Sequence, residues 1–220
     1  YEGNGLTYTV DAGVDVDWNV HGKLVLDSEW WERDQEWFMG FGQYTESTLS
    51  RLSVTPRYVW EGAVGGMAQK VTVGADFLFD DLELNRFRDR SAAQRHADAK
   101  LLQDVYGGYV SSETTFPNDI ILALSARKEH ASIDYNYVQY LPRNRVESGS
   151  KDFTGDALSV GLTWLCRDEL RLFTRFDTLF RYPATDEIAD YQGFGMNDAF
   201  NDNLDAETGR SYEIGLTLSS

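Results

Sequence analysis

The strictest constraint in this sequence is a two-residue rhythm of apolar and polar side chains close to the C-terminal end. From Leu170 to Tyr182 every second residue is apolar, aromatic or threonine, and the residues between them are mostly charged. Successive side chains of a β-strand point to opposite faces, so this segment predicts a strand with one apolar face and one charged face. Residues Ser211 to Leu218 repeat the pattern. Such strands fit either an antiparallel sheet of a soluble protein or a membrane barrel between lipid and water.

Three short segments around these strands have a recognisable order and spacing. Residues Phe180–Glu187, Asn201–Glu207 and Ser211–Leu216 read FRYPATDE, NDNLDAE and SYEIGL. They resemble the F-R-x-P-x-x-x-E, N-P-x-L-x-P-E and S-Y-E-x-G segments in the barrels of TonB-dependent outer-membrane receptors. Asp202 and Ala206 stand where this family has prolines, and Tyr182 stands where it has a small residue. These departures concern the shape of the loop.

The same rhythm recurs along the chain and predicts about nine strands. We place them at residues 6–18, 23–30, 51–60, 70–80, 101–116, 122–129, 157–164, 170–182 and 211–218. In the fifth strand the facing is ambiguous, and Gly107-Gly108 indicates a bulge. The fold predicted for residues 1–220 is all-β, an antiparallel up-and-down meander that forms part of a transmembrane β-barrel.

Connections between the predicted strands alternate between short and long. Short turns are expected at residues 19–22, 61–66, 117–119 and 167–168, and long loops near 32–47, 85–99, 139–152 and 183–209. Outer-membrane barrels have short periplasmic turns and long extracellular loops, so this alternation assigns a side of the membrane to each end of the sheet. Trp18, Trp60 and Trp164 lie close to short turns on the apolar face, as expected for an aromatic belt at the periplasmic interface.

The polar face of the predicted sheet carries many ionisable residues. An ordinary protein core does not tolerate so many charges, because each unpaired buried charge costs several kcal/mol. These side chains therefore face water, or pair across a lumen or with a plug, and the opposite face meets lipid. The residues on this inward face are Asp11, Asp15, Asp17, Arg51, Arg57, Asp76, Asp80, Arg127, Arg171, Arg175, Asp177, Arg181 and Glu213.

Composition agrees with a barrel and excludes one class of partner. Aromatic residues make up 14% of the chain, as expected where aromatic girdles mark two membrane interfaces. Alternation hides the hydrophobicity of barrel strands, so the slightly negative mean hydropathy does not exclude a membrane protein. A net charge of −16 argues against nucleic acid, because phosphate binding needs clustered basic residues. Cys166 is the single cysteine and has no partner for an intrachain disulfide.

Catalytic and metal-binding patterns are lacking in the sequence. His21, His96 and His130 are far apart, and none has the spacing of a metal-binding motif such as H-E-x-x-H. Neither a nucleophile elbow nor a glycine-rich phosphate loop occurs. We therefore expect no enzyme activity, no metal and no cofactor.

The resemblance implies a role in nutrient uptake. A TonB-dependent receptor binds a scarce nutrient (a ferric siderophore, haem, cobalamin or a glycan) at its extracellular loops, and TonB supplies energy through a plug domain. We expect the plug, its TonB-binding motif and the remaining strands of a larger barrel to be absent from these 220 residues. The expected partners are outer-membrane lipid, TonB through that plug, and the small nutrient molecule.

Aromatic residues in the predicted loops are the candidate ligand contacts, because aromatic rings bind ligands by stacking and apolar contact. They are Trp37, Phe38, Tyr44, Tyr191 and Phe194. Packing within the loops is an equally good explanation for any one of them. The luminal residues Arg171, Arg175 and Arg181 either steer an anionic ligand or pair with carboxylates of the lumen or plug.

Two other outer-membrane functions stay open at this stage. A passive porin-like channel would have no plug. A protease of the omptin type would place Asp and His together at the rim of the barrel, which here requires an Asp beside His96 or His130.

Overall fold

The computed structural model describes residues 2–18, 21–38, 44–141, 144–167, 169–183, 185–188, 200–201 and 203–218. In this part of the chain, nine strands form one sheet in the order β1 to β9, and every neighbouring pair is antiparallel. The strands are β1 (Glu2–Asp17), β2 (Lys23–Phe38), β3 (Tyr44–Val64), β4 (Met67–Phe87), β5 (Arg95–Thr115), β6 (Ile120–Gln139), β7 (Arg145–Arg167), β8 (Leu170–Arg181) and β9 (Glu207–Leu218). The predicted all-β meander is confirmed.

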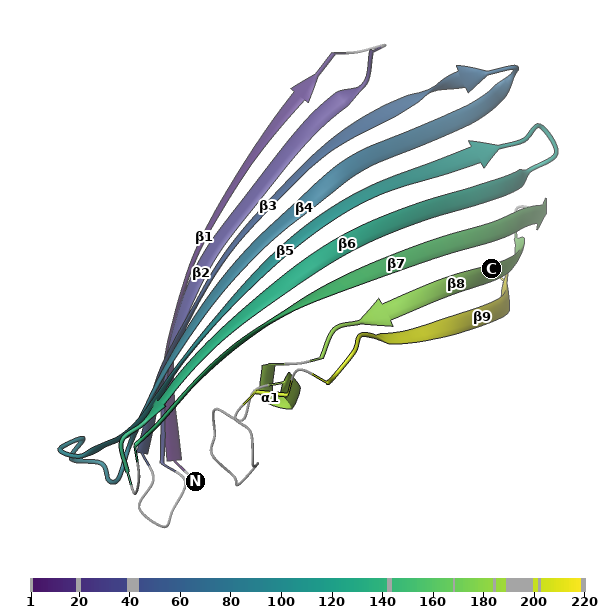
Figure 1. Ribbon diagram of the computed structural model, residues 1–220. Helices are drawn as coiled ribbons and strands as arrows, with labels where there is room; N and C mark the ends of the chain where they lie inside the picture. Colours follow the sequence, from purple (N-terminus) through teal and green to yellow (C-terminus); the bar gives the residue numbers. More distant parts are fainter. Residues whose placement is uncertain are drawn as a thin grey trace.

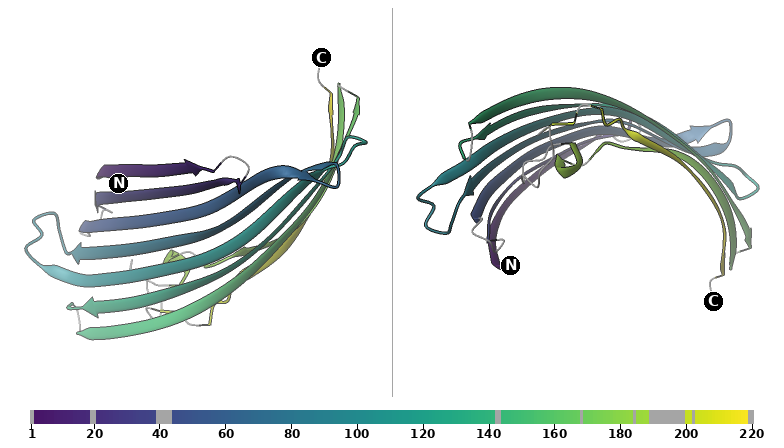
Figure 2. Two further views of the ribbon diagram at one scale, coloured as in Figure 1. Left: turned by 90° about the horizontal axis from the view of Figure 1, so that it is seen from above. Right: turned by 60° about the horizontal axis from the view of Figure 1, so that its bottom comes forward.

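The sheet curves into an arch, and a short helix lies under it. Figures 1 and 2 show the strands side by side in chain order, with the helical turn α1 (Thr185–Ile188) beneath the concave side. We call the concave side of the sheet its inner face and the convex side its outer face. None of the helical segments in the described residues is long and apolar enough to cross a membrane.

Several strands are much longer than the sequence predicted. β3, β4 and β5 each have 21 residues and β7 has 23, whereas a tilted membrane-spanning strand needs only about 9–11. The expected long loops at 32–47, 85–99 and 139–152 are therefore wrong in large part, because strands occupy 32–38, 44–47, 85–87, 95–99, 139 and 145–152. Of the four predicted loops, only the connection between β8 and β9 is long.

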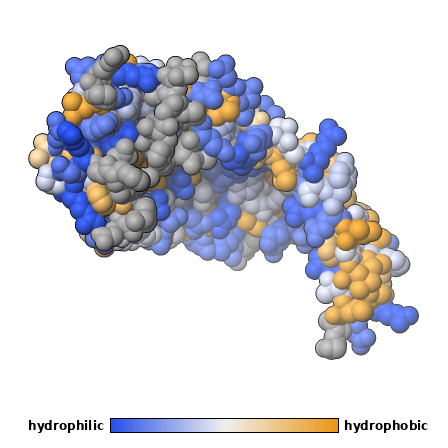
Figure 3. Space-filling view, turned by 90° about the horizontal axis from the view of Figure 1, so that it is seen from below, coloured by the Kyte–Doolittle hydropathy of each residue, from blue (hydrophilic) through white to orange (hydrophobic). Residues whose placement is uncertain are grey.

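Outer-face residues are apolar in the half of the sheet next to the short turns. Trp18 and Trp164 are 50% and 49% exposed there, and Trp60 pairs laterally with Val71 on the same face. No second protein layer in the described residues covers them. In Figure 3, hydrophobic residues gather at the narrow, projecting end of the molecule, while the broad end is mostly hydrophilic. We call the half of the sheet next to the short turns the membrane half.

The apolar face changes side in the other half of the same strands. The outer face there is polar, and the inner face of β4 to β7 carries buried Leu84, Leu101, Ile133, Tyr135 and Phe153. The prediction that every strand keeps one apolar face is therefore wrong beyond the membrane half, where a polar outer face is suited to water rather than lipid. The outer polar residues of this extracellular half include Asp81, Glu83, Asn85, Asp98, Lys100, Asp134, Asn136, Ser148 and Ser150.

The predicted bulge at Gly107-Gly108 is also wrong. β5 pairs continuously with β4 and β6 through both glycines, and the irregularity lies instead between Arg86 and Phe87. A Cβ at Gly107 would lie 2.8 Å from Nη2 of Arg127. Glycine at this position thus makes room for a guanidinium that crosses the inner face.

Candidate functional site

Ion pairs connect side chains within and between strands on the inner face of the membrane half. The Arg51 guanidinium donates to Asp80 through Nε at 2.6 Å and through Nη2 at 2.7 Å. Arg57 pairs with Asp27 at 2.6 Å, and Arg127 pairs with Asp76 and Glu129. The predicted inward charges are therefore largely compensated within the wall, as a water-filled or plugged lumen requires.

The three predicted luminal arginines differ in their surroundings. Arg175 Nε lies 2.9 Å from Asp177 Oδ1, and Arg181 binds two glutamates described below. Within the described residues, no carboxylate forms an ion pair with Arg171. Arg171 and Arg175 line a groove of about 530 Å³ on the inner face. Small side chains such as Ser125, Ser159 and Gly161 form its floor, so this part of the wall has room for another molecule or segment.

A pocket of about 640 Å³ lies at the far end of β1 to β3 and brings together three of the predicted aromatic residues. Its lining includes Trp37, Phe38, Tyr44, Glu36 and Arg90. The Arg90 guanidinium carbon lies 4.6 Å from the centre of the Phe38 ring, a cation–π contact. The structure therefore makes one concave surface from residues that the sequence placed in a single loop.

We call this pocket the rim pocket. Its aromatic residues lie on different faces of the sheet. Trp37 packs against buried apolar residues of the inner face, whereas the lateral pair Phe38 and Tyr44 belongs to the outer face. Burial, together with the Glu36 and Glu46 carboxylates, raises the pKa of Tyr44 to about 12. The Tyr44 hydroxyl is therefore a hydrogen-bond donor throughout the neutral pH range. The other two predicted contacts, Tyr191 and Phe194, lie outside the described residues.

The extracellular half contains an inner apolar cluster that sequence reasoning missed. Its buried members are Leu84, Ala97, Ala99, Leu101, Ala131, Ile133, Tyr135, Tyr137, Phe153 and Ile188. The signal was present in β6, where Leu122, Leu124 and Ala126 occupy even positions, whereas Ala131, Ile133, Tyr135 and Tyr137 occupy odd positions. A change in the phase of alternation, rather than its loss, marks the point where the strand leaves the membrane.

The described part of the β8–β9 connection lies on this cluster. We call residues 182–183, 185–188, 200–201 and 203–206 the strap. Ile188 is only 1% exposed within the cluster, and the Phe200 ring stacks on Tyr135 with centroids 5.7 Å apart. A Cβ at Gly149 would lie 2.5 Å from Cδ1 of Phe200. Glycine in β7 thus lets the strap lie directly against the wall.

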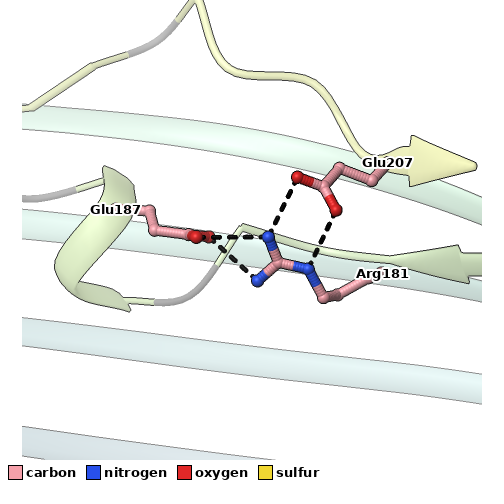
Figure 4. Close-up of polar contacts among 3 residues, drawn as sticks. All are labelled: Arg181, Glu187 and Glu207. Carbon is pink, nitrogen blue, oxygen red and sulfur yellow. Dashed lines mark hydrogen bonds and ion pairs between the residues drawn. The ribbon is translucent and has the colours of Figure 1, made fainter.

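One guanidinium holds both ends of the strap, as Figure 4 shows. Arg181 at the end of β8 donates to Glu187 of α1 through Nη1 and Nη2, both at 3.1 Å. It also donates to Glu207 at the start of β9 through Nε at 3.1 Å and Nη2 at 3.0 Å. These three residues are the Arg and the Glu residues of the two motifs noted in the sequence. We call them the Arg181 clamp.

The other titratable residues that the structure describes do not assemble into a catalytic or metal site. His130 Nε2 lies 3.9 Å from Asp152 Oδ1, but both side chains are on the outer face midway along β6 and β7. The protease alternative required such a pair at the rim. Among the described residues, no group of three or more His, Cys, Asp or Glu side chains is arranged to hold a metal ion.

Comparisons with known proteins agree with this geometry. A family model described as TonB dependent receptor-like, beta-barrel, matches residues 1–220. Searched against curated proteins, the sequence has no match.

Solved receptor structures share the fold at low sequence identity. The ferric citrate transporter FecA superposes with a TM-score of 0.76 at 16% identity over 96% of this chain. The siderophore receptor PiuA from Acinetobacter baumannii gives 0.77 at 10% identity over 97%, and the ferric-catecholate import receptor Fiu from E. coli K12 gives 0.76 at 11% over 98%. The match covers 32% of FecA and 38% each of PiuA and Fiu, so this chain spans about a third of their length.

Proposed function

The chain belongs to the TonB-dependent receptor-like β-barrel family, and from that premise we propose that it forms part of the wall of an active nutrient transporter. Proteins of this family are outer-membrane β-barrels of Gram-negative bacteria, and the outer membrane is where this chain lies. The nutrient is a siderophore-bound iron, haem, cobalamin or a glycan. The family match over the whole chain is the observation that carries the proposal.

The arrangement of the sheet supports a larger barrel. β1 and β9 are the edge strands of the described sheet and are not neighbours in it. Unpaired backbone groups are prohibitive in lipid, so further strands must pair with these edges. We infer that the whole protein closes the barrel with those strands and fills the lumen with a plug that receives energy from TonB.

The rim pocket is the proposed point of ligand contact in this part of the barrel. Phe38 and Tyr44 offer aromatic surface and a hydroxyl donor, and Arg171 and Arg175 lie deeper, along the inner groove. Tyr191 and Phe194 remain candidates from the sequence. Replacing Phe38 by Ala is expected to raise the concentration at which uptake is half-maximal, without changing the amount of folded receptor.

Growth and uptake in a deletion strain test the transport function. A strain that lacks the full-length gene is expected to lose growth on one defined source of iron, vitamin or glycan and to regain it with the gene on a plasmid. Deleting tonB should abolish the same uptake. Uptake that continues without TonB would overturn the proposal in favour of a passive channel, which would also show steady conductance in planar bilayers.

A further inference from the structure

We propose that the strap is a reversible latch over the inner apolar cluster, and that Arg181 is the positioning residue that keeps it docked. The proposal concerns contacts within this chain and does not depend on which solute, if any, the barrel transports. Three observations carry it: the geometry of the Arg181 clamp, the points where the strap contacts the wall, and the weakness of both compared with the sheet itself.

The Arg181 clamp joins the helical turn α1 to the paired ends of β8 and β9, where Arg181 lies opposite Glu207 in the ladder. Its guanidinium makes two bonds to Glu187 and two to Glu207, so β8, α1 and β9 share one charged centre. A bidentate pair between Arg and a carboxylate fixes the relative orientation of the two side chains as well as the distance between them. The clamp therefore directs α1 under the arch, where Ile188 enters the cluster.

The strap contacts the wall at separate points, which lie on β7, the neighbour of β8, and on strands beyond it. Ile188 packs in a cluster that extends to Leu84 on β4. The second limb rests on Tyr135 through Phe200, and Asp205 pairs with Lys151 of β7 at 3.1 Å. These contacts are side-chain contacts. The backbone hydrogen bond from Asn201 N to Ile188 O, 2.8 Å long, joins the two limbs of the strap to each other rather than to the wall.

The ionic part of this attachment is weak. The side chains of Arg181, Glu187 and Glu207 are 51%, 44% and 67% exposed, and ion pairs so exposed contribute little and are screened by salt. The wall, by contrast, is held by continuous backbone pairing along β4 to β7. The strap can therefore leave the wall while the sheet stays intact. Its departure uncovers Tyr135, Tyr137 and Phe153 toward the lumen.

A disulfide between the strap and the wall reports the docked state. Phe200 Cγ lies 2.9 Å from the position of a Cβ at Gly149, so cysteines at these two positions have Cβ atoms within disulfide range. The experiment uses the full-length receptor in outer-membrane vesicles, with Cys166→Ser and the pair Gly149→Cys and Phe200→Cys. We expect mild oxidation to form the disulfide rapidly. Failure to form it in this parent would overturn the docked arrangement.

Variants of the clamp then test the role of Arg181. Glu187→Gln removes the negative charge that Arg181 meets on α1 and leaves the Arg181–Glu207 pair across β8 and β9. We expect Glu187→Gln to slow formation of the disulfide several-fold. In the parent, which carries only the two introduced cysteines and Cys166→Ser, 1 M NaCl should slow it by a similar factor. Arg57→Gln breaks an ion pair on the same inner face but remote from the strap, and it should leave the rate unchanged.

A double-mutant cycle separates positioning from general destabilisation. Arg181→Gln and Glu187→Gln act through one contact, so we expect the double variant to cross-link no more slowly than Arg181→Gln alone. Heat-dependent migration on a gel verifies that each barrel is folded. If Arg181→Gln does not fold, the rate in Glu187→Gln decides whether the Arg181 clamp positions the strap. An unchanged rate in Glu187→Gln, or equal slowing by Arg57→Gln, would overturn the proposal.

Discussion

Apolar and polar side chains alternate in both halves of the long strands, but the apolar residues are on opposite faces in the two halves. In the membrane half, apolar residues such as Val160 and Leu124 are on the outer face and ion pairs such as Arg51–Asp80 are on the inner face. In the extracellular half, Ile133 and Tyr135 are on the inner face. The hydrogen-bonded ladder continues unbroken from one half to the other in β6. The solvent outside the wall, lipid or water, therefore decides which phase of the alternation is stable.

The strongest test of this comparison places the same charge on the outer face of both halves. Val160 lies on β7 between Trp164 at the turn end and Asp156, where the outer face becomes polar. Val160→Arg should cost about 2–4 kcal/mol of unfolding free energy, the range for Arg near the bilayer midplane. Val146→Arg, on the same strand and face but 75% exposed beyond the membrane, should cost almost nothing.

Unfolding of the full-length barrel by denaturant in lipid vesicles measures both variants. Equal costs for Val160→Arg and Val146→Arg would mean that the membrane boundary does not lie where the alternation changes phase.

The next test removes apolar volume from the inner face. Ile133 is fully buried in the inner apolar cluster, so Ile133→Ala should cost about 2 kcal/mol of unfolding free energy through lost contacts and a cavity. The matched change in the membrane half is Ser125→Ala, on the inner face of the same strand. We expect its effect to lie within about 0.5 kcal/mol, as for a substitution outside a packed core. A comparable loss at Ser125 would refute the assignment of a core to the extracellular half alone.

A smaller effect is expected from the ion pairs of the membrane half. Arg51→Gln removes a bidentate ion pair with Asp80, whose side chain is 9% exposed. Because Arg51 itself is 35% exposed, we expect a loss of about 1 kcal/mol, near the upper end for a solvent-accessible pair. Raising the salt concentration should shrink the difference between Arg51→Gln and the parent. An effect of several kcal/mol would indicate that this part of the lumen is dry.

The smallest expected effect is a pH dependence in the extracellular half. Burial and the neighbouring Arg86 charge lower the pKa of His96, so the folded state favours the neutral imidazole. Its contribution to stability is complete above the ordinary histidine pKa of about 6.5 and falls as the pH drops below that value. His96→Gln should flatten this part of the curve of unfolding free energy against pH. A curve unchanged by His96→Gln would assign the acid sensitivity to another group.

Much of the membrane half followed from the sequence. Alternation from Leu170 to Thr178 and from Ser211 to Leu218 predicted both strands, their faces and their antiparallel pairing. The expectation that Tyr182 lies on the outer apolar face is wrong, because Tyr182 follows the end of β8 and packs against the inner apolar cluster. The positions of Trp18 and Trp164 on the outer face followed from the same period of two. This succeeds because period and turn chemistry are local, and because lipid on one side and water on the other leave only one stable orientation of each strand.

The extracellular half was decided by tertiary structure. Residues near Glu36 and Asn85 are polar or mixed in sequence and suggested loops, yet neighbouring strands on both sides hold them in the sheet. Contact between Phe200 and Tyr135, and the meeting of Glu187 and Glu207 at Arg181, depend on where a long connection folds back. Such contacts join residues far apart in the chain, and no local period records them. Side-chain alternation alone thus determined where the chain crosses lipid, and only the folded arch determined what covers its inner wall.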